Sequence, residues 1–136
     1  MASPASAPKA RPRPLSPHLQ VWKLTLTMVM SGLHRITGMG LCVGVFLLLW
    51  FLLALSGDGT SFATFSAFIG SWFGQLLLIG FCWALFHHLL GGVRHAIWDT
   101  GWGMDDPWRE YLAGGTMVGS LLLTAIVWIV SLYVRR

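Results

Sequence analysis

Hydrophobic residues occur in three long runs that two short polar segments separate. The run over residues 36–56 contains no charged residue, and at about 1.5 Å of rise per residue such a helix crosses the roughly 30 Å hydrocarbon core of a bilayer. The interruptions at residues 56–60 and 99–107 combine Gly with Ser, Asp or Pro, which is typical of loops. The pattern predicts three transmembrane helices, at about residues 26–56, 65–97 and 111–134.

The composition favours a membrane protein, because 55% of the residues are hydrophobic and only 10% are charged. A soluble domain carries about 25% charged residues, so this chain lacks the polar side chains to cover a surface in water. The nine Lys and Arg residues outnumber the five acidic ones, but they lie at the ends of the apolar runs. That placement suits lipid headgroups rather than nucleic acid. The predicted fold is an all-α integral membrane bundle of three helices, with no nucleic-acid partner.

The basic residues also predict an orientation. Residues 1–25 are expected to form a tail that meets the membrane interface, and residues 26–136 the transmembrane domain. The tail and the connection after the second helix carry basic residues, whereas the first connection has none, so the positive-inside rule places the N-terminus inside. Arg135 and Arg136 then lie outside, against that rule. The residues counted as inside are Lys9, Arg11, Arg13, Lys23, Arg94 and Arg109.

A first polar group opens the first predicted helix. Ser31 and Arg35 are one helical turn apart and share a face, with His34 beside them. A hydroxyl, an imidazole and a guanidinium together suit a small ligand with carbonyl or carboxylate oxygens. A simpler interpretation stays open: Arg35 extends to the interface and Ser31 bonds to its own helix backbone.

A second polar group closes the second predicted helix. His88 and His95 are two turns apart on one face, and His87 is turned about 100° from His88. Neutral imidazole in an apolar setting is a common axial ligand of haem iron. Gly92 leaves room beside His88, and Arg94 with His95, nearer the surface, suits the propionates of a porphyrin. The alternative is a set of hydrogen bonds between helices, although ionisable groups within the membrane are usually functional.

At these residues the chain resembles the cytochrome b membrane-anchor subunits of succinate dehydrogenase, the respiratory complex II. The third helix resembles that family by hydropathy alone. Three pieces, in the family's order and spacing, carry the resemblance: Arg13-Pro14-Leu15-Ser16-Pro17-His18, Ser31-x-x-His34-Arg35-x-Thr37-Gly38 and His88-x-x-x-Gly92-x-Arg94-His95-x-x-x-Asp99.

The resemblance implies one subunit of an enzyme made of four different chains. A flavoprotein oxidises succinate and an iron–sulfur subunit passes the electrons on. Two small membrane anchors hold a haem b and reduce ubiquinone. This chain would be the cytochrome b anchor, a subunit that does not bind succinate and holds no catalytic residue. The Ser-Pro-His sequence of the tail resembles the alphaproteobacterial and mitochondrial branch of the family, and the short chain favours the bacterial cytoplasmic membrane over the mitochondrial inner membrane.

The resemblance also implies roles for single residues. His88 falls at the position of an axial ligand of the haem iron, and the second anchor would supply the other ligand. Ser31 and Arg35 fall at the quinone site. His34, Arg35 and His95 would lie near the haem propionates.

Three alternatives stay open at this point. Because His87 directly precedes His88, a register one residue off would make His87 the ligand. A different b-type cytochrome would take both axial ligands from this chain, for example His34 and His88. A non-redox membrane protein, such as a small transporter or an assembly subunit, would use the histidines for protons or metal.

Overall fold

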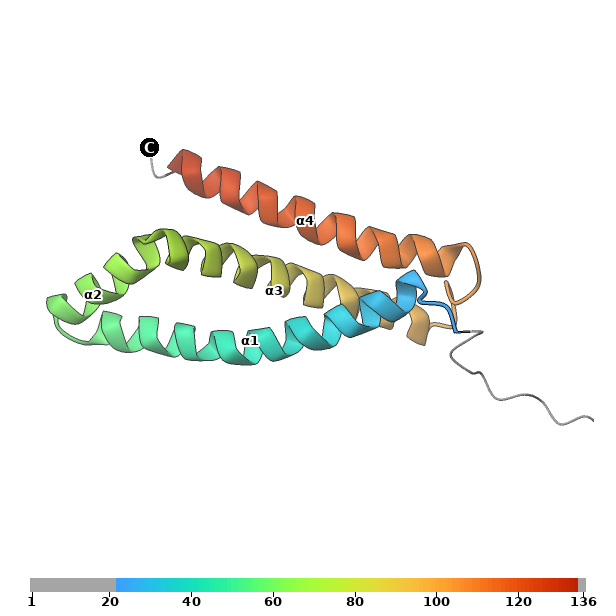
Figure 1. The fold of residues 1–136 in the computed structure, drawn as a ribbon, viewed down its shortest axis with the longest axis horizontal. Helices are drawn as coiled ribbons and strands as arrows, with labels where there is room; N and C mark the ends of the chain where they lie inside the picture. The colour runs from blue at the N-terminus through green and yellow to red at the C-terminus, as the bar shows by residue number, and fades with distance from the viewer. Residues whose placement is uncertain (1–21, 135–136) are drawn as a thin grey trace, which may run out of the picture.

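The described part of the chain is helical. The computed structural model describes residues 22–134, and within that range all regular secondary structure is helical: α1 (Leu26–Ser56), α2 (Gly59–Gly70), α3 (Trp72–Asp99) and α4 (Trp108–Val134) (Figure 1). Three of these helices, α1, α3 and α4, are long and apolar enough to cross a membrane. The predicted all-α fold with three spans is therefore confirmed.

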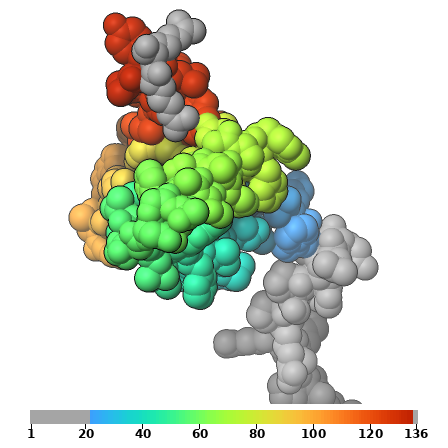
Figure 2. All heavy atoms as spheres, turned by 90° about the vertical axis from the view of Figure 1, so that its left-hand side faces the viewer, coloured from blue at the N-terminus to red at the C-terminus, as the bar shows by residue number. Residues whose placement is uncertain are grey.

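The helix α3 is the centre of the arrangement, since it contacts α1, α2 and α4. α1 and α3 lie side by side and antiparallel, and α2 joins them at one end (Figure 1). α4 runs back along α3 from the loop at the other end and diverges from α1 towards its own C-terminus. In the view along the bundle, the last part of α4 stands clear of the other helices (Figure 2).

Most large apolar side chains face outwards. Only four apolar residues of the described part are buried, namely Met30, Ala54, Phe65 and Ala113. In the most apolar 18-residue stretch of each long helix, between 11% and 17% of the residues are buried inside the chain. Such an apolar surface would favour aggregation in water, but it suits contact with lipid or apolar partner chains. The helical backbone can lie in lipid because it satisfies its own polar groups.

The sequence-based expectation of one helix over residues 65–97 is wrong at its start. α2 ends at Gly70 and α3 begins at Trp72, because Ser71 adopts an extended backbone and caps both helices. The Ser71 hydroxyl accepts a hydrogen bond from the Gly74 N–H at 3.1 Å. The chain turns so tightly that a Cβ at Gly74 would collide with the backbone of Phe68 and Ile69. Serine followed by a glycine in the first turn was the available signal.

The turn between α1 and α2 is closed by Asp58, the N-cap of α2. Its carboxylate accepts hydrogen bonds from the Ser61 hydroxyl at 2.6 Å, the Ser61 N–H at 2.8 Å and the Thr60 hydroxyl at 3.0 Å. These hydrogen bonds lower the pKa of Asp58, and the bond from the Ser61 hydroxyl has the largest effect. The cap therefore contributes fully to folding stability above the ordinary pKa of about 3.9. That contribution is lost as the pH falls through the lower pKa of the folded state.

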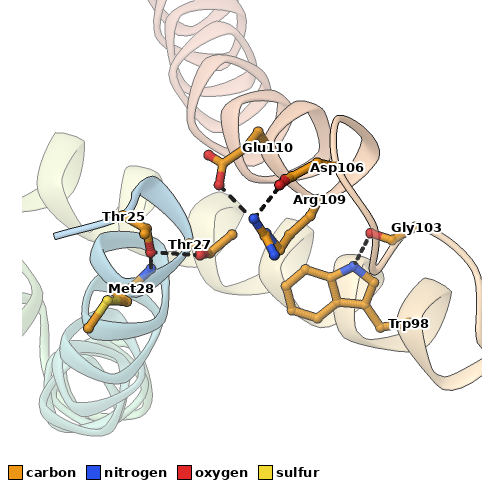
Figure 3. A network of polar contacts seen from close by, with 8 residues as sticks. All are labelled: Thr25, Thr27, Met28, Trp98, Gly103, Asp106, Arg109 and Glu110. Carbon is orange, nitrogen blue, oxygen red and sulfur yellow. Dashed lines mark hydrogen bonds and ion pairs between the residues drawn. The ribbon is translucent and has the colours of Figure 1, made fainter. Parts of the chain in front are cut away.

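The loop between α3 and α4 lies beside the start of α1, at the end of the bundle opposite α2 (Figures 1 and 3). Gly101 and Gly103 adopt positive φ angles of 81° and 80°, which favour glycine. The Trp98 indole N–H donates to the Gly103 carbonyl at 2.9 Å. Arg109 lies between Asp106, at 2.7 Å, and Glu110, at 3.7 Å (Figure 3). The first bond holds the loop against the end of α3, and the ion pairs hold it at the start of α4.

We expect the Asp58→Ala variant to fray the first turn of α2 at neutral pH, because Ala provides no acceptor for the Ser61 N–H. Asp58→Asn should stay close to the wild type, since Asn is also a favourable N-cap. Hydrogen–deuterium exchange over residues 59–64 in nanodiscs measures the difference. Equal exchange rates in the Ala and Asn variants would contradict this role of the cap.

Candidate functional site

Two adjacent faces of α3 carry its ionisable side chains. His88 and His95 lie two turns apart on the face towards α1, where both rings lie near the ring of His34. His87 and Arg94, also two turns apart, share the next face and are buried. Because each residue advances a helix by about 100°, neighbours in the sequence belong to different interfaces here.

Three histidines gather between α1 and α3. The rings of His34 and His88 are stacked, with centroids 4.0 Å apart and planes 6° apart. The ring of His95 lies 5.4 Å from that of His34 at an angle of 60°. His34 and His88 are half-buried, and His95 is exposed. The structure therefore brings together three of the predicted site residues near the end of the bundle that carries the α3–α4 loop.

The backbone carbonyl of His34 connects the two helices. His88 Nδ1 lies 3.1 Å from it, and the Thr37 hydroxyl donates to the same oxygen at 3.0 Å. A ring nitrogen beside a carbonyl is a donor, so Nδ1 of His88 carries a proton, and Nε2 makes no hydrogen bond within residues 22–134. Metal-ligating histidines commonly have this arrangement, with the second nitrogen bonded to a carbonyl or carboxylate. No role for Thr37 was expected from the sequence, although Thr37 lies one turn after His34.

Ser31 and Arg35 are both exposed on α1. Within residues 22–134, neither side chain has a hydrogen-bond or ion-pair partner. Other hydroxyls differ: Thr37, Thr116 and Thr124 each donate to a carbonyl one turn earlier in their own helix. The interpretation that Ser31 bonds to its own backbone is therefore not what the structure has. Both side chains present free donors to whatever lies against α1.

The interface between α3 and α4 contains a second polar group. His87 is fully buried, and its Nδ1 lies 3.5 Å from the Ser120 hydroxyl. The indole of Trp83 packs against it, with ring centroids 5.3 Å apart. His87 Nε2 and Trp83 Nε1 are buried and have no hydrogen-bond partner among residues 22–134. The four-residue spacing of Thr116, Ser120 and Thr124 was the available signal for a polar face on α4.

Arg94 is buried within the chain, unlike its exposed neighbour His95. It is only 3% exposed, and its guanidinium carbon lies 5.1 Å from the centre of the Trp98 ring. It also lines a cleft of about 170 Å³ with residues of α4, among them Thr116. The helical period accounts for this, since Arg94 shares its face with His87 rather than with His95.

The geometry disfavours three alternatives left open by the sequence, namely His87 as the ligand, two ligands from this chain, and a metal site. A haem between His34 and His88 would need the porphyrin to pass between two rings that are stacked only 4.0 Å apart. His87 faces α4 with no exposed surface. Within residues 22–134, no group of three or more His, Cys, Asp or Glu side chains is placed to hold a metal ion. Among His34, His87, His88 and His95, only His88 has a ring nitrogen bonded to a backbone carbonyl, and its ring is also partly exposed.

The fold and the site define a multi-pass helical membrane protein with an imidazole group near one end of its spans. Comparison with known families is more specific. The chain belongs to the succinate dehydrogenase/fumarate reductase transmembrane subunit family, whose model matches residues 9–130. It is therefore a membrane-anchor subunit of an oxidoreductase complex.

Named relatives cover most of the chain. The succinate dehydrogenase cytochrome b556 subunit of Paracoccus denitrificans is 39% identical over 118 residues, which is 87% of this chain and 91% of the relative. The cytochrome b560 subunit of Reclinomonas americana is 36% identical over 124 residues, covering 87% and 85%. The mitochondrial cytochrome b560 subunit of Mus musculus is 35% identical over 115 residues, covering 83% and 68%.

Proposed function

We propose that this chain is the anchor of a succinate:ubiquinone oxidoreductase that helps to bind haem b and ubiquinone. Its partners would be a second small membrane anchor, an iron–sulfur subunit and a flavoprotein subunit. The observation that carries the proposal is the free Nε2 of His88, on a ring whose Nδ1 is bonded to the His34 carbonyl. Family membership supports the setting.

His88 is the proposed axial ligand. Its ring is half-buried on the α1–α3 face, which leaves it accessible to a second chain that would provide the other ligand. No Cβ occupies position 92, and a Cβ built there would meet nothing within 4 Å, which leaves space for a flat macrocycle. When bound, haem b would take up and release one electron at a time. The protein's part is to hold the ring in one tautomer and orientation.

His34 and His95 are the proposed neighbours of the haem propionates. Their rings lie within 5.4 Å of one another beside His88 and near the loop end of the bundle. Imidazole N–H groups are suitable donors to carboxylates. Arg35, one residue after His34 but on the exposed side, would add a charged donor at the edge of this group.

Ser31 and Arg35 are proposed to bind the quinone head. Both are exposed on α1, one turn apart, and have no partner within the described residues. An arginine fork and a small hydroxyl suit the two carbonyl oxygens of a quinone, which become more basic as the ring is reduced. This chain would therefore bind the electron acceptor while succinate is oxidised on another subunit.

The N-terminus and the α3–α4 loop are proposed to lie inside, in the cytoplasm of a bacterium. Among the described residues, Lys23 precedes α1, Arg35 lies in the first turns of α1, and Arg94 and Arg109 flank the α3–α4 loop. The start of α1 and that loop lie at the same end of the bundle (Figure 1). In the turn between α1 and α2, at the opposite end, the only charged residue is the acidic Asp58. The remaining basic residues of the tail and the C-terminal Arg135 and Arg136 lie outside the described range.

We expect His88→Ala to remove the haem or convert it from low spin, while succinate oxidation coupled to a soluble dye persists. His87→Leu is the matched control and should lower stability but keep the low-spin spectrum, because His87 packs against α4. The dithionite-reduced spectrum of the purified complex measures both. A normal spectrum in His88→Ala, or its loss only in His87→Leu, would overturn the ligand assignment.

We expect Arg35→Ala to lower ubiquinone reduction by succinate about 10- to 100-fold, while dye-linked activity is kept. A hydrogen bond to a charged group contributes about 1.5–3 kcal/mol, and each 1.4 kcal/mol corresponds to a factor of ten. Ser31→Ala should have a smaller effect in the same direction. Lys23→Ala, which removes an exposed charge at the same end, is the control. Equal loss of both activities would indicate failed assembly rather than a quinone site.

We expect a membrane-impermeant maleimide to label Gly59→Cys in intact cells, in a background with Cys42→Ala and Cys82→Ala. The exposed Asp105→Cys should be labelled only after the membrane is opened, because the α3–α4 loop would lie inside. The reverse pattern would contradict the proposed orientation.

A further inference from the structure

Two imidazole rings each pack against a glycine of the facing helix, and these two glycine positions, Gly38 and Gly91, are called the glycine seats. A Cβ built at Gly38 of α1 would lie 2.9 Å from Cε1 and 3.3 Å from Nδ1 of His88. A Cβ at Gly91 of α3 would lie 2.9 Å from Cε1 of His34 and would collide with its Nδ1. Because α1 and α3 are antiparallel, the two seats are reciprocal, and each helix provides one glycine and one ring.

These close approaches are specific to particular glycines. A Cβ at Gly40 of α1 or at Gly80 of α3 would meet nothing within 4 Å. Both of these line an apolar groove of about 450 Å³ between the same two helices, so a methyl group has room there. Small residues at helix interfaces allow close packing in lipid. Further along the interface, Gly44 receives the phenyl ring of Phe81, which is packing alone.

The glycine seats differ from ordinary packing because Gly38 contacts the ring of His88, the proposed ligand, and Gly91 contacts the ring of His34, which stacks on it. The missing Cβ atoms let the rings of His34 and His88 stack at 4.0 Å. They also let His88 Nδ1 approach the His34 carbonyl to 3.1 Å. A methyl at position 38 would press on Cε1, the carbon between the two ring nitrogens. The ring would then have to turn away from that carbonyl.

We propose that Gly38 and Gly91 are positioning residues that set the orientation of the His88 imidazole towards its ligand. Gly38 acts on the His88 ring directly. Gly91 acts through His34, whose ring covers one face of His88 and whose carbonyl accepts the His88 N–H. The ligand class is a metal-bearing macrocycle, so this inference rests on the proposed role of His88.

The first test compares Gly38→Ala with Gly40→Ala and Gly80→Ala in the complete complex. All three variants gain the same helix propensity, since Ala favours a helix over Gly by about 1 kcal/mol. We expect Gly38→Ala to keep its haem but to shift the low-spin electron paramagnetic resonance signal and the midpoint potential. The two controls should match the wild type in both. A Gly38→Ala complex with wild-type signal and potential would overturn the positioning role and leave haem binding intact.

The second test does not depend on haem. We expect Gly91→Ala to lower the unfolding temperature of the complex, because its methyl collides with the His34 ring. In a His34→Ala background the same methyl has room, so Gly91→Ala should cause no further decrease. Additive decreases in the double variant would overturn the seat at Gly91. If Gly38→Ala does not assemble, the electron paramagnetic resonance signal and midpoint potential of Gly91→Ala test the positioning role instead, and wild-type values there would overturn it.

The two tests separate the inference from the function on which it rests. If His88→Ala keeps a normal haem, the ligand assignment fails, and the positioning role fails with it. A coupled cycle at Gly91 and His34 would then indicate packing alone. If His88→Ala loses the haem and the cycle is coupled, the seats and the ligand belong to the same site.

Discussion

Lipid offers no hydrogen bonds to polar side chains, and this constraint accounts for the bonds that several polar side chains of the long helices make to backbone carbonyls. Thr37, Thr116 and Thr124 donate to carbonyls of their own helices. His88 donates to a carbonyl of α1, which joins two spans. Ser31 and Arg35 have no such partner within residues 22–134, so their donors remain for a ligand or another subunit. These two free donors support the proposal that this face of α1 binds a ligand or another subunit.

The helical period then assigns neighbouring histidines to different interfaces. His88 faces α1 and a partly open surface, whereas His87 is fully buried against α4. A cofactor shared between two chains needs a ligand that a second chain can approach, and of the two only His88 has that access. The interface with α4 instead combines a buried histidine with serine and threonine hydroxyls, which helps to keep α4 on α3.

The candidate site was largely accessible to sequence reasoning, and its departures have physical causes. The sequence grouped Arg94 with His95, but a turn of about 100° per residue places Arg94 on the buried face with His87. The second predicted helix began too early, because hydropathy does not register the extended backbone of Ser71 between two apolar segments. The glycine seats are invisible in one dimension, since a glycine opposite an imidazole becomes apparent only when two antiparallel helices are placed in register.

The sequence by itself determined the class of fold, the three spans and the residue types of the site, because bilayer thickness and helical rise restrict what an apolar run of this length can form. It also indicated the family through the spacing of a few polar residues. The tertiary structure decided which histidine faces an open surface, which nitrogen of His88 is free and which glycines the rings contact. Those properties depend on the rotation and register of α1 against α3, which side-chain packing sets over long range and no local pattern encodes.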